Sequence, residues 1–78
     1  MVNIFLVDNH PLVIEGIKKT LHDVPTINIV GEAHTATDTL KLLVEKPVAH
    51  LVLLDLKLPD EDGVSVCKKL RSAFPGIK

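Results

Sequence analysis

The sequence is poor in the residues that mark several large classes of protein. It has two phenylalanines and no tryptophan or tyrosine among 78 residues, so the aromatic platforms on which single-stranded nucleic acids stack are missing. Its ten acidic residues slightly outnumber its nine lysines and arginines, so the net charge gives no electrostatic case for binding nucleic acid, which normally needs a basic face. We therefore expect no direct binding of nucleic acid by this chain.

Cysteines and long apolar runs are also scarce. Cys67 is the one cysteine, which excludes an internal disulfide and a zinc site built from cysteines. A lone cysteine in a helical pattern is most often a small core residue. No apolar run approaches the ~20 residues that cross a bilayer, and the first residues lack the basic stretch of a signal peptide. We expect a cytoplasmic protein with no membrane segment.

Short aliphatic runs are what the sequence does have. Residues 4–7 and 51–54 are uninterrupted apolar stretches of the kind that form buried parallel strands, and we expect residues 27–30 to form another strand between them in the sequence. Apolar residues at helical spacing follow each run, and we expect these stripes to pack in the core. They are Val13, Ile17 and Leu21 after Pro11; Ala36, Leu40, Leu43 and Val44 after a cap at Thr35 or Thr37, ending at Lys46 and Pro47; and Val66, Cys67, Leu70 and Phe74. This β-α-β-α-β-α alternation predicts one small domain with parallel strands and right-handed crossovers.

Two carboxylates stand directly after apolar runs. Asp8 follows the first run and Asp55 the third, and the carboxyl ends of parallel strands are where open α/β sheets place their ligand chemistry. We therefore expect both side chains at one polar site. The simpler alternatives are that Asp55 caps a turn and that Asp8 complements the dipole of the next helix. His10 is interpreted as a loop or capping residue rather than a metal ligand or general base, and 60–62 as a solvated acidic loop, with partner docking as the alternative.

Three segments resemble the receiver domain of bacterial response regulators, in the branch whose output is a helix-turn-helix (the NarL/FixJ type). The first is Phe5 to Gly16, with a strand, an acid, His-Pro and Glu-Gly; the second is Val30 to Ala33; the third runs from Leu53 to Pro59 and is followed by Asp62-Gly63. The resemblance covers residues 2–78. It implies a truncated flavodoxin-like (β-α)3 unit over residues 1–78, with a parallel three-stranded sheet in the order 2-1-3 flanked by helices. The later strands and helices and the output domain are expected to be absent.

The resemblance also implies roles for individual residues. Asp55 would be the phosphoacceptor, and Mg²⁺ would be bound by Asp8, Asn9, Asp55 and the backbone carbonyl of Lys57. The donor would be a sensor histidine kinase acting on the intact parent, which would control transcription. Asn9 stands where the family normally has a second acid, so we expect weaker binding of Mg²⁺. An enzyme with a substrate of its own is not expected.

The shortened sheet suggests a second function. With the order 2-1-3 the third strand lies at an edge, where unpaired backbone groups invite pairing with another chain. We therefore expect homo-oligomers, formed through this strand or by exchange of elements. The alternative function is a degenerate receiver that accepts no phosphoryl group and acts as a self-association or protein-binding module.

Overall fold

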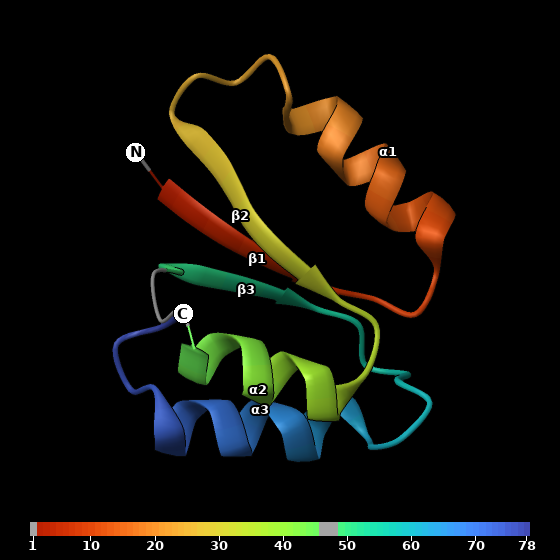
Figure 1. Cartoon of the computed structure of the whole chain (residues 1–78), viewed down its shortest axis with the longest axis vertical. Coiled ribbons are helices and arrows are strands. Elements are labelled where there is room, and N and C mark those ends of the chain that lie inside the picture. Colours follow the sequence, from red (N-terminus) through yellow and green to blue (C-terminus); the bar gives the residue numbers. More distant parts are fainter. Residues whose placement is uncertain (1, 46–48) are drawn as a thin grey trace.

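A computed structural model describes residues 2–45 and 49–78 as three strands alternating with three helices (Figure 1). The elements are β1 (Val2–Val7), α1 (Pro11–Leu21), β2 (Ile27–Ala33), α2 (Ala36–Glu45), β3 (Leu51–Leu54) and α3 (Gly63–Ala73). All three predicted strands and helices are present, and β2 continues three residues further than predicted. The predicted end of the second helix at Lys46 and Pro47 lies outside the described residues. No helix within the described ranges combines the length and the apolar character needed to cross a membrane.

The strands form a parallel sheet in the order β2-β1-β3. This confirms the predicted three-stranded unit and its strand order. Along β3 the pairing runs from Ile4 opposite Leu51 to Val7 opposite Leu54. The outer edge of β3 is not wholly open, because Lys78 donates its N–H to the carbonyl of His50 and accepts from the N–H of Val52. Beyond these two bonds, no strand among the described residues pairs with that edge.

A register shift interrupts the pairing of β1 with β2. Ile4 lies opposite Ile29 and Phe5 lies opposite Gly31, so Val30 is an extra residue in β2. A side chain at Gly31 would place its Cβ 2.8 Å from Cε2 of Phe5. Gly31 therefore leaves room for the Phe5 ring, which would have to move if this position carried a side chain.

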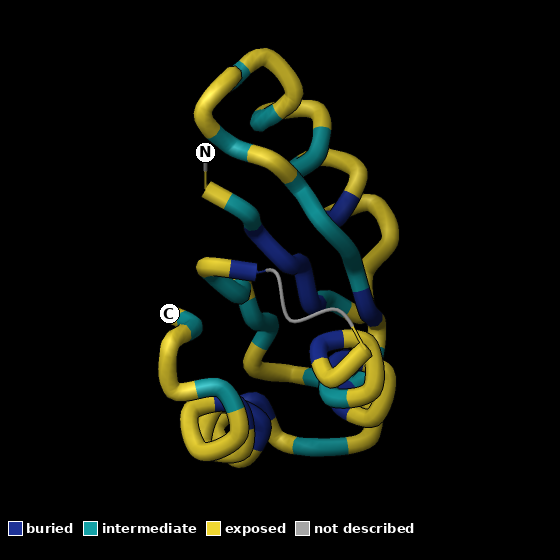
Figure 2. The backbone as a smooth tube through the Cα atoms, turned by 60° about the vertical axis from the view of Figure 1, so that its left-hand side comes forward, coloured by how far each residue is buried: buried dark blue, intermediate teal, exposed yellow. Residues whose placement is uncertain are grey.

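The helices cover the two faces of the sheet unequally. Helix α1 lies alone on one face and α2 and α3 lie together on the other, while β1 is the most deeply buried strand (Figures 1 and 2). Among the described residues, the buried apolar side chains on the α1 face are Ile4, Leu6 and Ile14. On the opposite face they are Phe5, Val7, Ala33, Ala36, Leu43, Ala49, Val66 and Leu70.

Three predicted core positions are wrong. Val13 is exposed, and α1 instead turns Ile14 toward the sheet, with Ile17 and Leu21 beside it. Val44 is exposed on α2, where Thr39 is buried and donates its hydroxyl to the carbonyl of Thr35. Cys67 is exposed on α3. A helical stripe about 100° wide includes neighbours that fit the spacing equally well, so packing against the sheet decides which ones are buried.

Candidate functional site

Asp8 and Asp55 lie side by side because their strands are neighbours in register. Val7 and Leu54 are opposite each other at the ends of β1 and β3, so the next residue of each strand emerges at the same edge. The N–H of Asp55 donates to the carbonyl of Val7, and the N–H of Asp8 donates to the carbonyl of Ala33. The sheet backbone thus fixes the position of both carboxylates, as the sequence pattern predicted.

His10 joins these two carboxylates. It occupies the N-cap position of α1, next to Pro11, but its side chain makes no capping hydrogen bond. Its Nδ1 lies 2.8 Å from Oδ1 of Asp8 and 3.6 Å from Oδ2 of Asp55. The expected helix-capping position is therefore correct, while the proximity of the ring to both acids was missed. The sequence feature that could have indicated this proximity is the position of His10 two residues after Asp8, in the turn that leads to α1.

One ligand atom from each of Asp8, His10 and Asp55 lies within 4.8 Å of the others. Burial raises the pKa of Asp8, but the backbone N–H and ring of His10 outweigh burial and hold the pKa of that carboxyl below its usual value. Asp8 is therefore an anion at neutral pH. A negatively charged oxygen beside an imidazole and a second carboxylate is a set of donors suited to a cation.

The two carboxylate oxygens of Asp55 differ in their hydrogen bonding. The N–H of Lys57 donates to Oδ1 over 3.1 Å. Oδ2 is buried and has no hydrogen-bond partner among the described residues. An unpartnered buried oxygen of this kind is uncommon in proteins and calls for an explanation, such as a bound ion.

The other two predicted ligands are Asn9 and Lys57, which follow the two aspartates in the sequence. Asn9 is on the exposed turn between Asp8 and His10. Lys57 is exposed in the loop after β3, where a bridge to Asp62 holds the chain. The loop therefore has a defined path close to Asp55.

Asp60 has a role that the sequence did not reveal. It was interpreted as part of a solvated acidic loop, but its carboxylate accepts hydrogen bonds from the backbone N–H groups of Ala36 and Thr37 and from the hydroxyl of Thr37. These bonds hold the pKa of Asp60 below its usual value. The loop after Asp55 thus caps the first turn of α2, together with Thr35, whose hydroxyl accepts from the N–H of Asp38.

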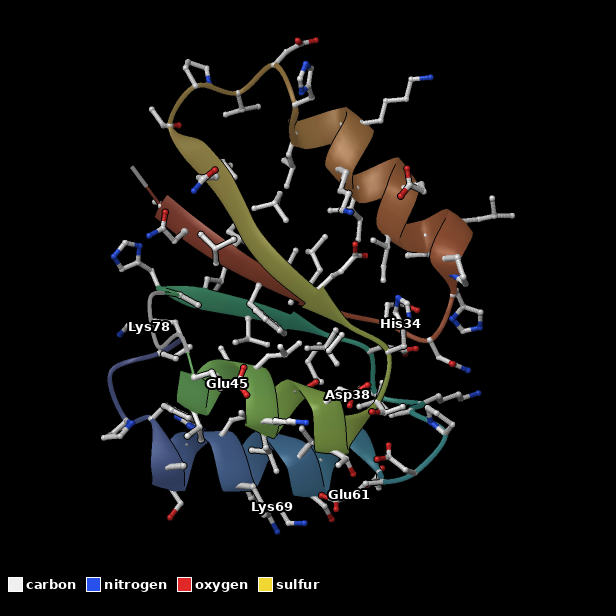
Figure 3. The ribbon with its side chains drawn as sticks, in the orientation of Figure 1. His34, Asp38, Glu45, Glu61, Lys69 and Lys78 are labelled. Atoms are coloured by element: carbon white, nitrogen blue, oxygen red, sulfur yellow. The ribbon has the colours of Figure 1, made fainter. Side chains whose placement is uncertain are left out.

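Glu61 of the same loop is paired with α3. Its Oε1 lies 2.6 Å from Nζ of Lys69, and the two side chains lie close together at the lower edge of the molecule in Figure 3. The loop that follows Asp55 is consequently attached to both helices on its face of the sheet.

The comparison with protein families agrees with this architecture. The model described as "Response regulator receiver domain" matches residues 4–78. The chain belongs to the response regulator receiver family. Among curated relatives, this receiver is 34% identical to the transcriptional regulatory protein RcsB of Salmonella typhi, over 97% of the chain and 36% of the relative. It is 39% identical to the response regulator GacA of Pseudomonas aeruginosa, over 100% of the chain and 36% of the relative.

Solved structures give the same result. The receiver resembles the non-phosphorylated receiver domain of RcsB from Escherichia coli with a TM-score of 0.91 and 32% identity, over 99% of this chain and 60% of that one. The isolated receiver domain of RcsB from Salmonella enterica serovar Typhimurium, in the presence of phosphomimetic BeF3⁻, has a TM-score of 0.87 and 32% identity, over 99% and 57%. The chain spans about a third of the length of these curated relatives.

Proposed function

We propose that this chain is the phosphoacceptor part of a two-component response regulator, with residues 1–78 forming the first three β-α units of its receiver domain. Asp55 would accept a phosphoryl group from a sensor histidine kinase, and the longer regulator would control transcription. The observation that carries this proposal is the buried Oδ2 of Asp55, which has no hydrogen-bond partner in the described part of the chain and lies near Asp8 and His10 at the carboxyl edge of the sheet. The relatives named as transcriptional and response regulators support it.

The chemistry is transfer of the phosphoryl group between two nucleophiles. One carboxylate oxygen of Asp55 forms a bond to phosphorus as the bond from phosphorus to the donor's imidazole nitrogen breaks, and the electron pair of that bond returns to the imidazole. The N–H of Lys57 donates to Asp55 and holds the carboxylate in one orientation. Fixing the nucleophile in this way lowers the entropic cost of reaching the transition state.

The donor set fits Mg²⁺. In this proposal the cation is bound by Asp8, Asp55, the side-chain amide oxygen of Asn9 and the backbone carbonyl of Lys57, which are the hard oxygen ligands that Mg²⁺ prefers. When bound, the ion would neutralise charge on the phosphoryl group during transfer. Asn9 contributes a neutral oxygen where the family normally has a carboxylate, so the affinity for Mg²⁺ should be low.

Beryllofluoride, which mimics a phosphoryl group on a carboxylate, tests the proposal directly. With Mg²⁺ and beryllofluoride present, we expect saturable changes in the NMR signals of the backbone amides of residues 55–57. Asp55→Asn should abolish them. Asp23→Asn, an exposed aspartate in the turn between α1 and β2, is the matched control and should leave them unchanged. Unchanged signals at high Mg²⁺ in the wild-type chain would contradict a phosphoacceptor role.

A second candidate function rests on the outer edge of β3. The two bonds to Lys78 occupy only the first part of this edge, and Leu53 is 39% exposed. A groove lined by apolar side chains that include Val52, Leu54 and Leu70 runs beside it. These features favour a self-association module, and light scattering should then show a molar mass that rises with concentration. A constant monomer mass would contradict it.

A further inference from the structure

The carboxylate pair has an imidazole neighbour that does not belong to the ligand set proposed above. Nδ1 of His10 lies 2.8 Å from Oδ1 of Asp8, which is a hydrogen-bonding distance, and 3.6 Å from Oδ2 of Asp55. The nitrogen thus lies beside the buried oxygen of Asp55 that has no hydrogen-bond partner within residues 2–45 and 49–78. A cation that satisfied this oxygen would also be within reach of the imidazole.

An imidazole changes which cations a site prefers. Mg²⁺ takes oxygen ligands almost exclusively, whereas Zn²⁺ and its neighbours in the first transition series bind imidazole nitrogen well. The site also lacks a third carboxylate, because Asn9 is neutral. The loss of a charged oxygen should lower the affinity for Mg²⁺ more than the affinity for an ion that also binds the imidazole nitrogen.

We propose that this site binds Zn²⁺ in preference to Mg²⁺, with Asp8, His10 and Asp55 as the three protein ligands. The inference rests on the proposed function in that it uses the same two carboxylates, and it adds His10 and a different class of metal ion. Three protein ligands are also the number found in zinc sites that keep one position open for solvent or another small ligand.

The backbone favours His10 in this role. The residue is fixed at the start of α1 beside Pro11, and its own N–H donates to Oδ1 of Asp8 over 2.8 Å. The His10 ring is exposed, with a relative side-chain accessibility of 63%. The ring can therefore exchange its hydrogen bond to Asp8 for a bond to a metal ion without any change in the core.

The test compares Zn²⁺ and Mg²⁺ by isothermal titration on the wild-type chain and on His10→Asn. Removal of the imidazole should weaken Zn²⁺ at least about tenfold, the lower bound seen even when only a ligand's outer partner is lost. The affinity for Mg²⁺ should stay within about twofold, because Mg²⁺ has little preference for nitrogen. His34→Asn is the matched control: His34 is also exposed and lies 4.0 Å from a carboxylate oxygen of Glu32, and its loss should leave the affinity of this site for Zn²⁺ unchanged.

Co²⁺ in place of Zn²⁺ gives a second readout. Its visible absorption bands should be altered by both His10→Asn and Asp55→Asn. Circular dichroism checks that each variant is folded. Both variants are expected to fold, because His10 is exposed and Asp55 lies outside the apolar core.

The outcomes separate this inference from the proposed function. Equal Zn²⁺ affinity in the wild-type chain and in His10→Asn would overturn the inference, even if Mg²⁺ and beryllofluoride still act at Asp55. Zn²⁺ binding that is insensitive to Asp55→Asn would also overturn it. Zn²⁺ binding that requires His10 and Asp55 would support it, even if beryllofluoride has no effect and the phosphoacceptor role fails.

Discussion

The two faces of the sheet differ in how firmly they are packed. Among the described residues, eight buried apolar side chains hold α2 and α3 against one face, whereas three hold α1 against the other. The candidate site draws on both: His10 begins the lightly packed helix, and the loop after Asp55 is bonded to both helices of the heavily packed face. The more firmly anchored side of the site is therefore the one that holds Asp55.

The largest expected effect comes from the core of the α2/α3 face. Leu43 is fully buried on α2, so Leu43→Ala should lower the free energy of unfolding by about 2–5 kcal/mol. Ile14→Ala on the α1 face should fall at the lower end of this range, because the thinner layer can collapse or admit water. Urea denaturation measures both. An equal or larger loss for Ile14→Ala would show that the two faces contribute alike.

Replacing a glycine by alanine should change the stability in opposite directions in α1 and in α3. A Cβ at Gly63 would lie 2.4 Å from the backbone Cα of Leu56, so Gly63→Ala should destabilise the fold by about 1–3 kcal/mol or more. A Cβ at Gly16 meets no other atom of the described residues within 4 Å, so Gly16→Ala should stabilise α1 by roughly 0.5–1 kcal/mol through helix propensity. Thermal unfolding gives the sign of each change, and a stabilising Gly63→Ala would refute the close packing of this loop.

A smaller effect on stability should appear in acid, because the aspartates at the starts of α2 and α3 differ in their hydrogen bonds. Hydrogen bonds from the N–H groups of Ala36 and Thr37 lower the pKa of Asp60. The stability that it contributes is therefore complete above its ordinary pKa of 3.8 and is lost as the pH falls through the lowered value. Asp60→Ala should lower the melting temperature at neutral pH and make its decline below pH 3.8 shallower.

Asp62 provides the control for that experiment. It stands at the N-cap of α3 but makes no side-chain capping bond. Asp62→Ala should change the acid profile much less than Asp60→Ala. If both variants behave alike, the bond from the loop to α2 does not contribute measurably to stability.

The sequence was sufficient to predict the sheet order and the meeting of Asp8 with Asp55. The sheet order came from the resemblance to receiver domains, whereas the meeting of the two aspartates follows from short apolar runs and from the rule that parallel strands end at the same edge. It was not sufficient for Asp60, which bonds to residues 23 and 24 positions earlier in the chain. No local pattern encodes such a bond, since it depends on the path of the loop in space.

The same limit applies to the faces of the helices. The spacing of Val13, Ile17 and Leu21 was compatible with one stripe, yet Ile14 is the residue that the sheet buries. Cys67 lies next to the buried Val66, so a rotation of one residue along α3 decides its exposure. Helical periodicity predicts that an apolar face exists, and the shape of the opposing sheet selects its members.

The extra residue in β2 has a consequence for insertions and deletions. Side chains alternate between the two faces of a strand. The extra residue Val30 therefore changes which face of the sheet each later residue of β2 occupies. That reversal is why Glu32 reaches Lys18 on α1 while Ala33 lies in the core beneath α2. Deleting Val30 would remove the extra residue and leave these two side chains on their present faces. A one-residue insertion after Gly31 would instead exchange their faces and drive a carboxylate into the larger core. The strand should therefore tolerate the loss of its extra residue better than a one-residue insertion.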